Sequence, residues 1–213
     1  MKRLAVVALL LGGCSTLPPR VGEPPAQVSN AQDEQAYHEV LDRWTRHTTI
    51  YDQLDNRMFL AATLQTPEFV KARVDRVAAF KGLPTADAQA LLAHESAEAS
   101  NGYTFFFGVQ TEKRRWNDLD SDHSLWRVAL HTGAGEVTPV QIDRIDRPDV
   151  NLRGLYFYLG DFWVGYRVRF PSALPDGRPL VSPGETQLVV KVDSALGHAH
   201  LEFPAYAVAI ETH

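Results

Sequence analysis

Cysteine is scarce in this sequence, and an excess of positive charge is absent. One cysteine among 213 residues excludes an intrachain disulfide, a zinc site built from several cysteines and a thiol redox pair. The 26 acidic side chains outnumber the 21 basic ones, which argues against a nucleic-acid partner, because such binding depends on neutralising phosphates. A hydrophobic share of 45% excludes a wholly disordered chain and is enough for one good-sized core or two small ones.

Two common catalytic motifs are also missing. The sequence has no Gly-x-Ser-x-Gly elbow, which would expose a nucleophilic serine, and no glycine-rich loop with a lysine, which would hold phosphates. His94 and Glu95 begin a zincin-like pattern, but Glu98 stands where the second histidine is needed. We interpret the stretch from His94 to Glu98 as a polar stripe on a solvated helix face.

The N-terminus has the pattern of a secretion signal. Lys2 and Arg3 precede the apolar run Leu4–Leu11, which is far shorter than the ~20 residues that span a bilayer. The run ends in Leu11-Gly12-Gly13-Cys14, which resembles the lipobox of bacterial lipoproteins. The resemblance implies a signal peptide over residues 1–13, cleavage after Gly13 and lipidation of Cys14. The alternative is an ordinary export signal with an incidental cysteine.

The lipobox resemblance also implies a location. Two or three acyl chains such as palmitate would hold the protein stably in a membrane, whereas a single chain holds a protein only marginally. Ser15, rather than aspartate, follows the cysteine, and in similar Gram-negative lipoproteins this favours the outer membrane. Loss of Lys2 and Arg3 would leave 19 basic and 26 acidic side chains, a net charge of −7.

Residues 14–33 are interpreted as the lipidated cysteine and a proline-rich tether. Pro18, Pro19, Pro24 and Pro25 bias this segment toward extended polyproline II, and it has almost no large apolar side chain. Such a tether would hold the folded part on the order of 30 to 50 Å from the lipid. No linker follows residue 33, so we treat residues 34–213 as a single domain.

Helical spacing of apolar residues predicts three helices. Tyr37, Val40, Leu41 and Trp44 recur at one face of an N-terminal helix. The pair Thr66-Pro67 is typical of a helix start, and Gly82 is typical of its end. A second helix, capped by Thr85, would run to residue 101. The insertion 67–101 is therefore predicted to be a helical hairpin.

Alternation of apolar and polar residues predicts strands over much of the remaining chain. It is clearest at residues 126–131, 140–143, 164–170 and 188–193, which Gly and Pro turns separate, and a hairpin is expected over residues 48–65. The predicted fold is mainly β, an antiparallel β-sandwich-like domain with an inserted helical hairpin and an N-terminal helix. The pattern Trp126-x-Val128-x-Leu130 is similar to strands of uncharacterised envelope lipoproteins, a resemblance that implies no activity.

Two groups of residues are candidates for ligand binding. Trp163, Arg167 and Arg169 would share the polar face of one strand, where an exposed tryptophan beside guanidinium groups stacks on a sugar or pairs with an anion. The basic run Lys113-Arg114-Arg115-Trp116 would meet lipid head groups or an acidic partner. The alternatives are a tryptophan covered by the helical hairpin and a solvated basic loop.

Two further groups are candidates for metal binding. Asp118, Asp120 and Asp122 are spaced like the ligands of a calcium loop, although His123 and Ala129 replace the glycine and glutamate of that motif. The alternative is an aspartate-rich turn.

The second metal candidate lies near the C-terminus. His198, His200 and Glu202 would lie in a row on one face of a strand and would suit zinc. Plain amphipathicity predicts the same alternation. No cofactor is expected unless calcium or zinc binds at one of these groups.

The sequence favours a lipid-anchored cell-envelope protein with a binding or structural role. Its partner would be another envelope protein or a cell-wall polymer, besides the membrane that holds its lipid anchor. The alternative is a metal-dependent hydrolase acting on an envelope substrate, centred on His198, His200 and Glu202 with help from Asp120 or Asp122.

Overall fold

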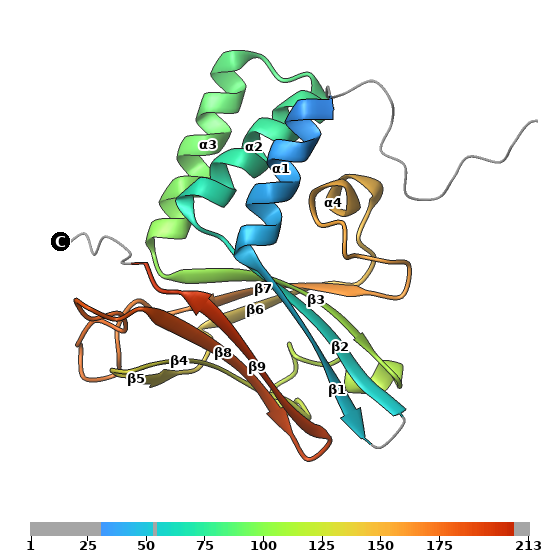
Figure 1. Cartoon of the computed structure of the whole chain (residues 1–213), viewed down its shortest axis with the longest axis vertical. Helices are drawn as coiled ribbons and strands as arrows, with labels where there is room; N and C mark the ends of the chain where they lie inside the picture. The colour runs from blue at the N-terminus through green and yellow to red at the C-terminus, as the bar shows by residue number, and fades with distance from the viewer. Residues whose placement is uncertain (1–30, 53–54, 207–213) are drawn as a thin grey trace, which may run out of the picture.

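The computed structural model describes residues 31–52 and 55–206, which form two antiparallel sheets with helices on one side (Figure 1). This arrangement confirms the predicted mainly β, sandwich-like fold class. In spatial order, the first sheet contains β1 (Thr45–Asp52), β2 (Asp55–Leu64), β3 (Tyr103–Thr111), β7 (Val164–Phe170) and β6 (Gln141–Ile145). The second sheet contains β5 (Gly135–Val137), β4 (Arg127–Thr132), β8 (Gln187–Ser194) and β9 (Gly197–Pro204).

The main core lies between the two sheets, and alternation along each strand decides which side chains enter it. On β8, Leu188, Val190 and Val192 are fully buried, as period-two geometry requires. Strand β3 is different, because its aromatic run is buried on both faces. Phe105 faces the core between the sheets, whereas its neighbour Phe106 packs against the helices on the other side.

Four α-helices lie among the described residues: α1 (Ala31–Trp44), α2 (Pro67–Lys81), α3 (Thr85–Ser100) and α4 (Val150–Leu155). A short 3₁₀ turn, η1 (Arg114–Trp116), follows β3. The predicted start of α2 is confirmed, because Thr66 Oγ1 accepts a hydrogen bond from the Phe69 amide at 3.2 Å. Its end is also as predicted, with Gly82 in the left-handed conformation at φ 58°. The predicted cap at Thr85 is wrong, since Thr85 is already helical, Pro84 precedes it and no side chain caps α3.

The helices cover the outer face of the first sheet and enclose a second apolar cluster (Figure 1). Tyr37 of α1, Phe69 of α2 and Phe106 of β3 meet there with Tyr156, which follows α4. Helix α3 contributes no fully buried residue. No helix in residues 31–52 or 55–206 is long and apolar enough to cross a membrane.

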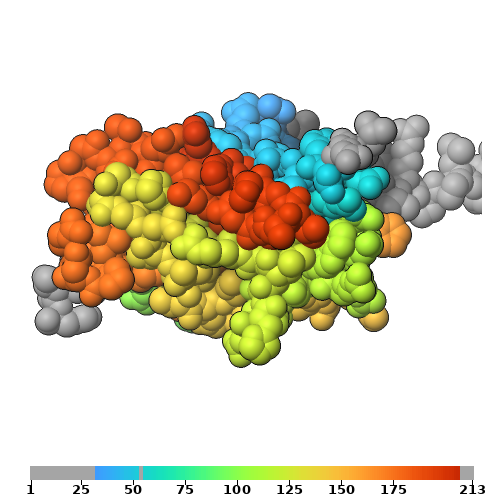
Figure 2. All heavy atoms as spheres, turned by 90° about the horizontal axis from the view of Figure 1, so that it is seen from below, coloured from blue at the N-terminus to red at the C-terminus, as the bar shows by residue number. Residues whose placement is uncertain are grey.

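The sheets approach each other at the edge where β9 and β1 lie side by side, red against cyan in Figure 2. Arg46 Nε on β1 donates a hydrogen bond to the Glu202 carbonyl oxygen of β9 at 2.9 Å. A Cβ atom on Gly197 would lie only 2.4 Å from the Ile50 side chain, so glycine is needed for this close approach.

Candidate functional site

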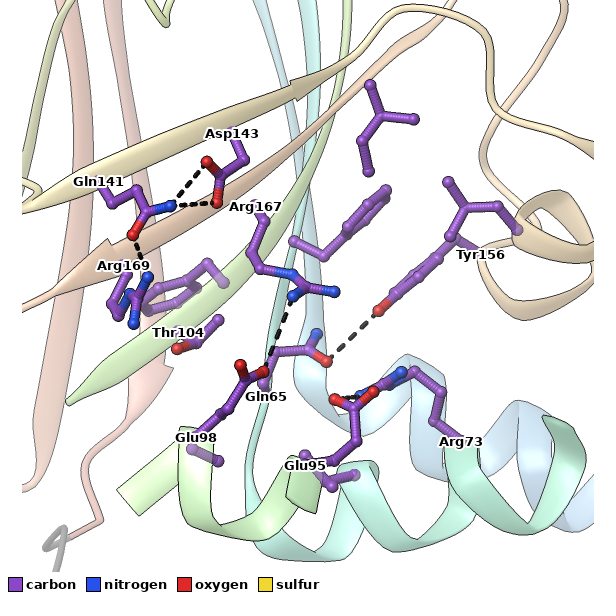
Figure 3. A pocket seen from close by; sticks show the side chains of 16 residues that line it. Gln65, Arg73, Glu95, Glu98, Thr104, Gln141, Asp143, Tyr156, Arg167 and Arg169 are labelled. Carbon is purple, nitrogen blue, oxygen red and sulfur yellow. Dashed lines mark hydrogen bonds and ion pairs between the residues drawn. The ribbon is translucent and has the colours of Figure 1, made fainter. Parts of the chain in front are cut away.

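A cleft of about 200 Å³ lies between the outer face of the first sheet and helices α2, α3 and α4 (Figure 3). Its polar lining combines cations and anions in equal number. The charged and polar side chains that line it are Gln65, Arg73, Glu95, Glu98, Thr104, Gln141, Asp143, Tyr156, Arg167 and Arg169. We call this site the arginine–glutamate cleft.

Strand β7 supplies two arginines to the arginine–glutamate cleft. Because side chains alternate along a strand, Arg167 and Arg169 point away from the core that buries Val168 and Phe170. Arg169 Nη2 donates a hydrogen bond to Gln141 Oε1 on the neighbouring strand β6. The Arg167 side chain is half exposed, and its Nη1 lies 3.8 Å from Glu98 Oε2.

Helix α3 supplies the opposite wall with two carboxylates one turn apart, Glu95 and Glu98. Glu95 Oε2 accepts a hydrogen bond from Arg73 Nη2 at 2.7 Å, and both side chains are largely buried. Burial raises the pKa of Glu95, but the hydrogen bond and charge of Arg73, with a smaller effect of Arg167, outweigh it, so this pKa lies below its ordinary value. Glu95 therefore stays ionised at neutral pH.

An aromatic pair closes the inner end of the arginine–glutamate cleft. The Tyr156 ring stacks on Phe106 with 3.9 Å between centroids, and the Tyr156 hydroxyl donates a hydrogen bond to Gln65 Oε1 at 3.3 Å. Burial raises the pKa of Tyr156, which keeps the hydroxyl protonated as a donor at neutral pH. The cleft thus places charges of both signs beside a buried aromatic wall, which suits a small ligand that carries a carboxylate and an ammonium group.

Trp163 lies on the same helix-covered side of the first sheet as Arg167 and Arg169, as predicted, but it lines a different site. It precedes β7 and packs near Tyr158, with 6.3 Å between ring centroids, rather than under the helical hairpin. Together with Arg114, Arg147 and Phe162 it lines a separate groove of about 400 Å³ between η1 and the α4–β7 connection. We call this second site the η1 groove. Trp163 and Arg114, which were predicted to belong to two separate binding groups, therefore line the same groove.

The rest of the basic run has a different environment. The Trp116 ring lies under two cations, Lys113 Nζ at 4.5 Å and the Arg57 guanidinium at 5.8 Å from its centroid. Arg115 is exposed and lines neither the cleft nor the groove. The basic run is thus divided between an aromatic contact, the η1 groove and solvent.

His198, His200 and Glu202 alternate on β9 as predicted, exposed beside buried Ala199 and Leu201. Both histidines approach one carboxylate oxygen of Asp193, with His198 Nδ1 at 3.0 Å and His200 Nε2 at 3.4 Å. The backbone of Glu202 accepts a hydrogen bond from Arg46. Among residues 31–52 and 55–206, no group of three or more histidine, cysteine or carboxylate side chains is arranged to hold a metal ion.

The aspartate-rich segment has the hydrogen bonds of a turn. Asp118 accepts hydrogen bonds from the Ser124 hydroxyl and the Leu125 amide. Asp120 instead pairs with Arg144 Nη1 at 3.2 Å, and Asp122 is exposed. The structure therefore directs two of the three candidate calcium ligands to different partners.

Sequence reasoning missed the acidic wall of the arginine–glutamate cleft, because Glu95 and Glu98 were interpreted as part of a solvated stripe. It also missed Arg73 and Tyr156. The one signal available was the pair of glutamates at helical spacing. Cys14 and the tether up to residue 30 lie outside the described residues, and lipidation stays a prediction.

Neither a protein-family model nor a curated protein matches this chain. Among solved structures, the chain is similar to a protein of unknown function from Burkholderia pseudomallei. The two are 12% identical, the match covers 81% of this chain and 83% of that chain, and the TM-score is 0.42. Function therefore has to be argued from the site.

Proposed function

We propose that the protein is a lipid-anchored protein of the bacterial outer membrane whose folded domain binds a cell-wall polymer in the arginine–glutamate cleft. The observation that carries the binding role is the placement of Arg167 and Arg169 opposite Glu95 and Glu98. The membrane attachment is supported by the lipobox-like sequence that ends at Cys14.

The size and charge of the arginine–glutamate cleft favour a polymer over a folded protein. Pockets that enclose a drug-sized molecule measure roughly 300–1,000 Å³, so about 200 Å³ fits one or two residues of a short peptide. The peptides of a cell-wall polymer carry free carboxylates, which would pair with Arg167, and amino groups, which would pair with Glu98. A tethered domain would bring such a cleft to the polymer repeatedly, so modest affinity is sufficient.

Co-sedimentation with purified cell-wall polymer tests the binding role. The detergent-solubilised protein should pellet with the polymer, and Arg167→Glu should abolish this, because it sets two carboxylates against each other at the ligand site. Arg178→Glu is the matched control, since Arg178 is 64% exposed and pairs with Asp176 within its own turn. Equal pelleting of both variants, or capture of an envelope protein that Arg167→Glu leaves unchanged, would overturn the polymer assignment.

Membrane attachment has a separate test. The mature protein should have the mass of a chain that begins at an acylated Cys14, and Cys14→Ser should move from the membrane to the aqueous fraction after cell lysis. An unmodified thiol at Cys14 would contradict the anchor. No observation in the described residues favours the metal-dependent hydrolase over the binding role, and the metal content of the purified protein remains its test.

A further inference from the structure

We infer that the η1 groove contacts the membrane, where Arg114 and Arg147 bind the phosphate groups of anionic lipids and Phe162 inserts between the acyl chains. This inference rests on the proposed function, because it takes Cys14 to hold the protein at a bilayer. It assigns the groove to a lipid surface and leaves the arginine–glutamate cleft to the polymer.

The first observation is an unusual exposure of apolar side chains. Phe162 is 82% exposed and Val150 is 77% exposed, the two highest values for large hydrophobic side chains in the described residues. Single exposed hydrophobic residues are ordinary, but both of these lie between the start of α4 and the start of β7. Phenylalanine and tryptophan are the residues that interfacial membrane segments use, and Trp163 follows Phe162 directly.

The second observation is that the acidic side chains of the η1 groove already have cationic partners outside its lining. Asp146 accepts from Arg144 at 2.7 Å, and Asp161 accepts from Arg153. Glu112 pairs with Arg57.

The cations of the groove lack such partners. Arg114 and Arg147 line it, and neither has a carboxylate within ion-pair distance in the part of the chain that the structure describes, although both are near enough to Asp146 to lower the pKa of its carboxyl. Two unpaired guanidinium groups beside an exposed phenylalanine match a phosphate next to a hydrocarbon layer.

The third observation is the position of the segment relative to the predicted anchor. Helix α1 begins 17 positions after Cys14 and packs on the segment that follows α4. Tyr37 on α1 donates a hydrogen bond to the Leu155 carbonyl oxygen at 2.8 Å, and His38 stacks on Phe157 at 4.1 Å. The tether is thus joined to the part of the fold that carries Phe162, and tethering raises the local concentration of lipid enough for a weak contact to form.

Site-specific fluorescence in vesicles tests the inference with the full lipidated protein. Cys14 is the sole cysteine in the sequence and its sulfur would carry lipid, so the thiol of Phe162→Cys takes an environment-sensitive label selectively. In vesicles of phosphatidylethanolamine and phosphatidylglycerol, the label should shift to the blue and be quenched by brominated acyl chains. The matched control is Val140→Cys, a hydrophobic position that is 65% exposed directly before β6 and hydrogen-bonded to Arg169, at the end of β7 opposite the groove, whose label should stay unquenched.

Charge variants then test the phosphate contacts. On the Phe162→Cys background, Arg114→Gln and Arg147→Gln should each lower the ratio of docked to undocked protein about fivefold. Arg115→Gln removes the same charge from the neighbouring position outside the groove and should leave this ratio unchanged.

Three outcomes would overturn the inference: a label at position 162 as unquenched as one at position 140, equal quenching in phosphatidylcholine vesicles, or an equal loss with Arg115→Gln. Mass spectrometry of Cys14 separates this failure from failure of the anchor. An acylated Cys14 with an unquenched label at position 162 refutes the membrane contact alone.

Discussion

Arg167 on β7 faces Glu98 on α3 across the arginine–glutamate cleft, with 3.8 Å between Nη1 and Oε2 (Figure 3). Both side chains are about half exposed, so this outer pair is weak. The inner pair differs, because Arg73 and Glu95 lie 2.7 Å apart and are 13% and 19% exposed. The cleft therefore has one pair that supports the fold and one pair that a ligand can separate.

Arg167→Gln should separate binding from stability. The free energy of unfolding should change by less than about 0.5 kcal/mol, because an exposed pair at this distance contributes little. Affinity for the cell-wall polymer should fall about tenfold, the loss of one charge-assisted hydrogen bond. Urea unfolding and co-sedimentation measure the two effects. A variant that loses stability and binding together would show that Arg167 has a structural role instead.

Glu95→Gln should make the protein less stable at neutral pH but not in acid. Because the folded-state pKa of Glu95 is below the ordinary 4.5, its contribution is present above that value and is lost as the pH falls through the folded-state pKa. The variant should be about 1–2 kcal/mol less stable at pH 7, and the gap should close in acid. Urea unfolding at several pH values measures this. Glu98→Gln is the control, since its longer, exposed pair should yield no such gap.

Arg76→Ala should be one of the most destabilising substitutions in the helical layer. The Arg76 side chain is 5% exposed, forms two hydrogen bonds with Glu34 at 2.7 and 2.8 Å and donates to the Gly154 carbonyl oxygen. Its loss should cost about 3 kcal/mol, because the variant removes a buried cation that packs over the Tyr37 and Phe80 rings and hydrogen-bonds to α1 and α4. Arg43→Ala, which breaks an exposed pair, should cost less than about 1 kcal/mol. Similar costs in urea unfolding would contradict this assignment.

Tyr166→Phe should loosen the wall of the η1 groove at Asn117. The Tyr166 hydroxyl donates to Asn117 Oδ1 at 2.7 Å and accepts from Arg144 Nη1 at 2.8 Å. Asn117 is buried directly after η1, so the variant leaves a buried acceptor unpaired at a cost of about 1–3 kcal/mol. Hydrogen exchange should rise at Asn117 and Trp116. Tyr51→Phe, which removes an exposed hydroxyl, should change neither measurement.

Much of the fold was predictable because its signals are local. Alternation along residues 188–193 reports that one strand face is buried, and this is what β8 shows. Thr66 and Gly82 mark the ends of α2 through contacts within one turn of the helix. Thr85 shows the limit of such signals, because the residue expected to cap α3 is its first helical residue, and Pro84 holds the cap position one residue earlier.

The arginine–glutamate cleft was half predictable for the same reason. Period two correctly places Arg167 and Arg169 on the face opposite the core, with Trp163 on the same side. It could not predict that Trp163, directly before β7, lines a different site from the two arginines. The η1 groove needed contacts between η1 and the α4–β7 connection, and α4 itself was not predicted.

By itself, the sequence determined the β-rich class, the helical hairpin and the lipobox-like pattern at Cys14, since each of these depends on residues that are close together in the sequence. Only the tertiary structure decided that Glu98 faces Arg167 and that Arg114 and Phe162 line one groove. Periodicity reports that a face is covered or exposed, whereas the partner across a gap depends on how strands distant in sequence pair and where the helices pack upon them.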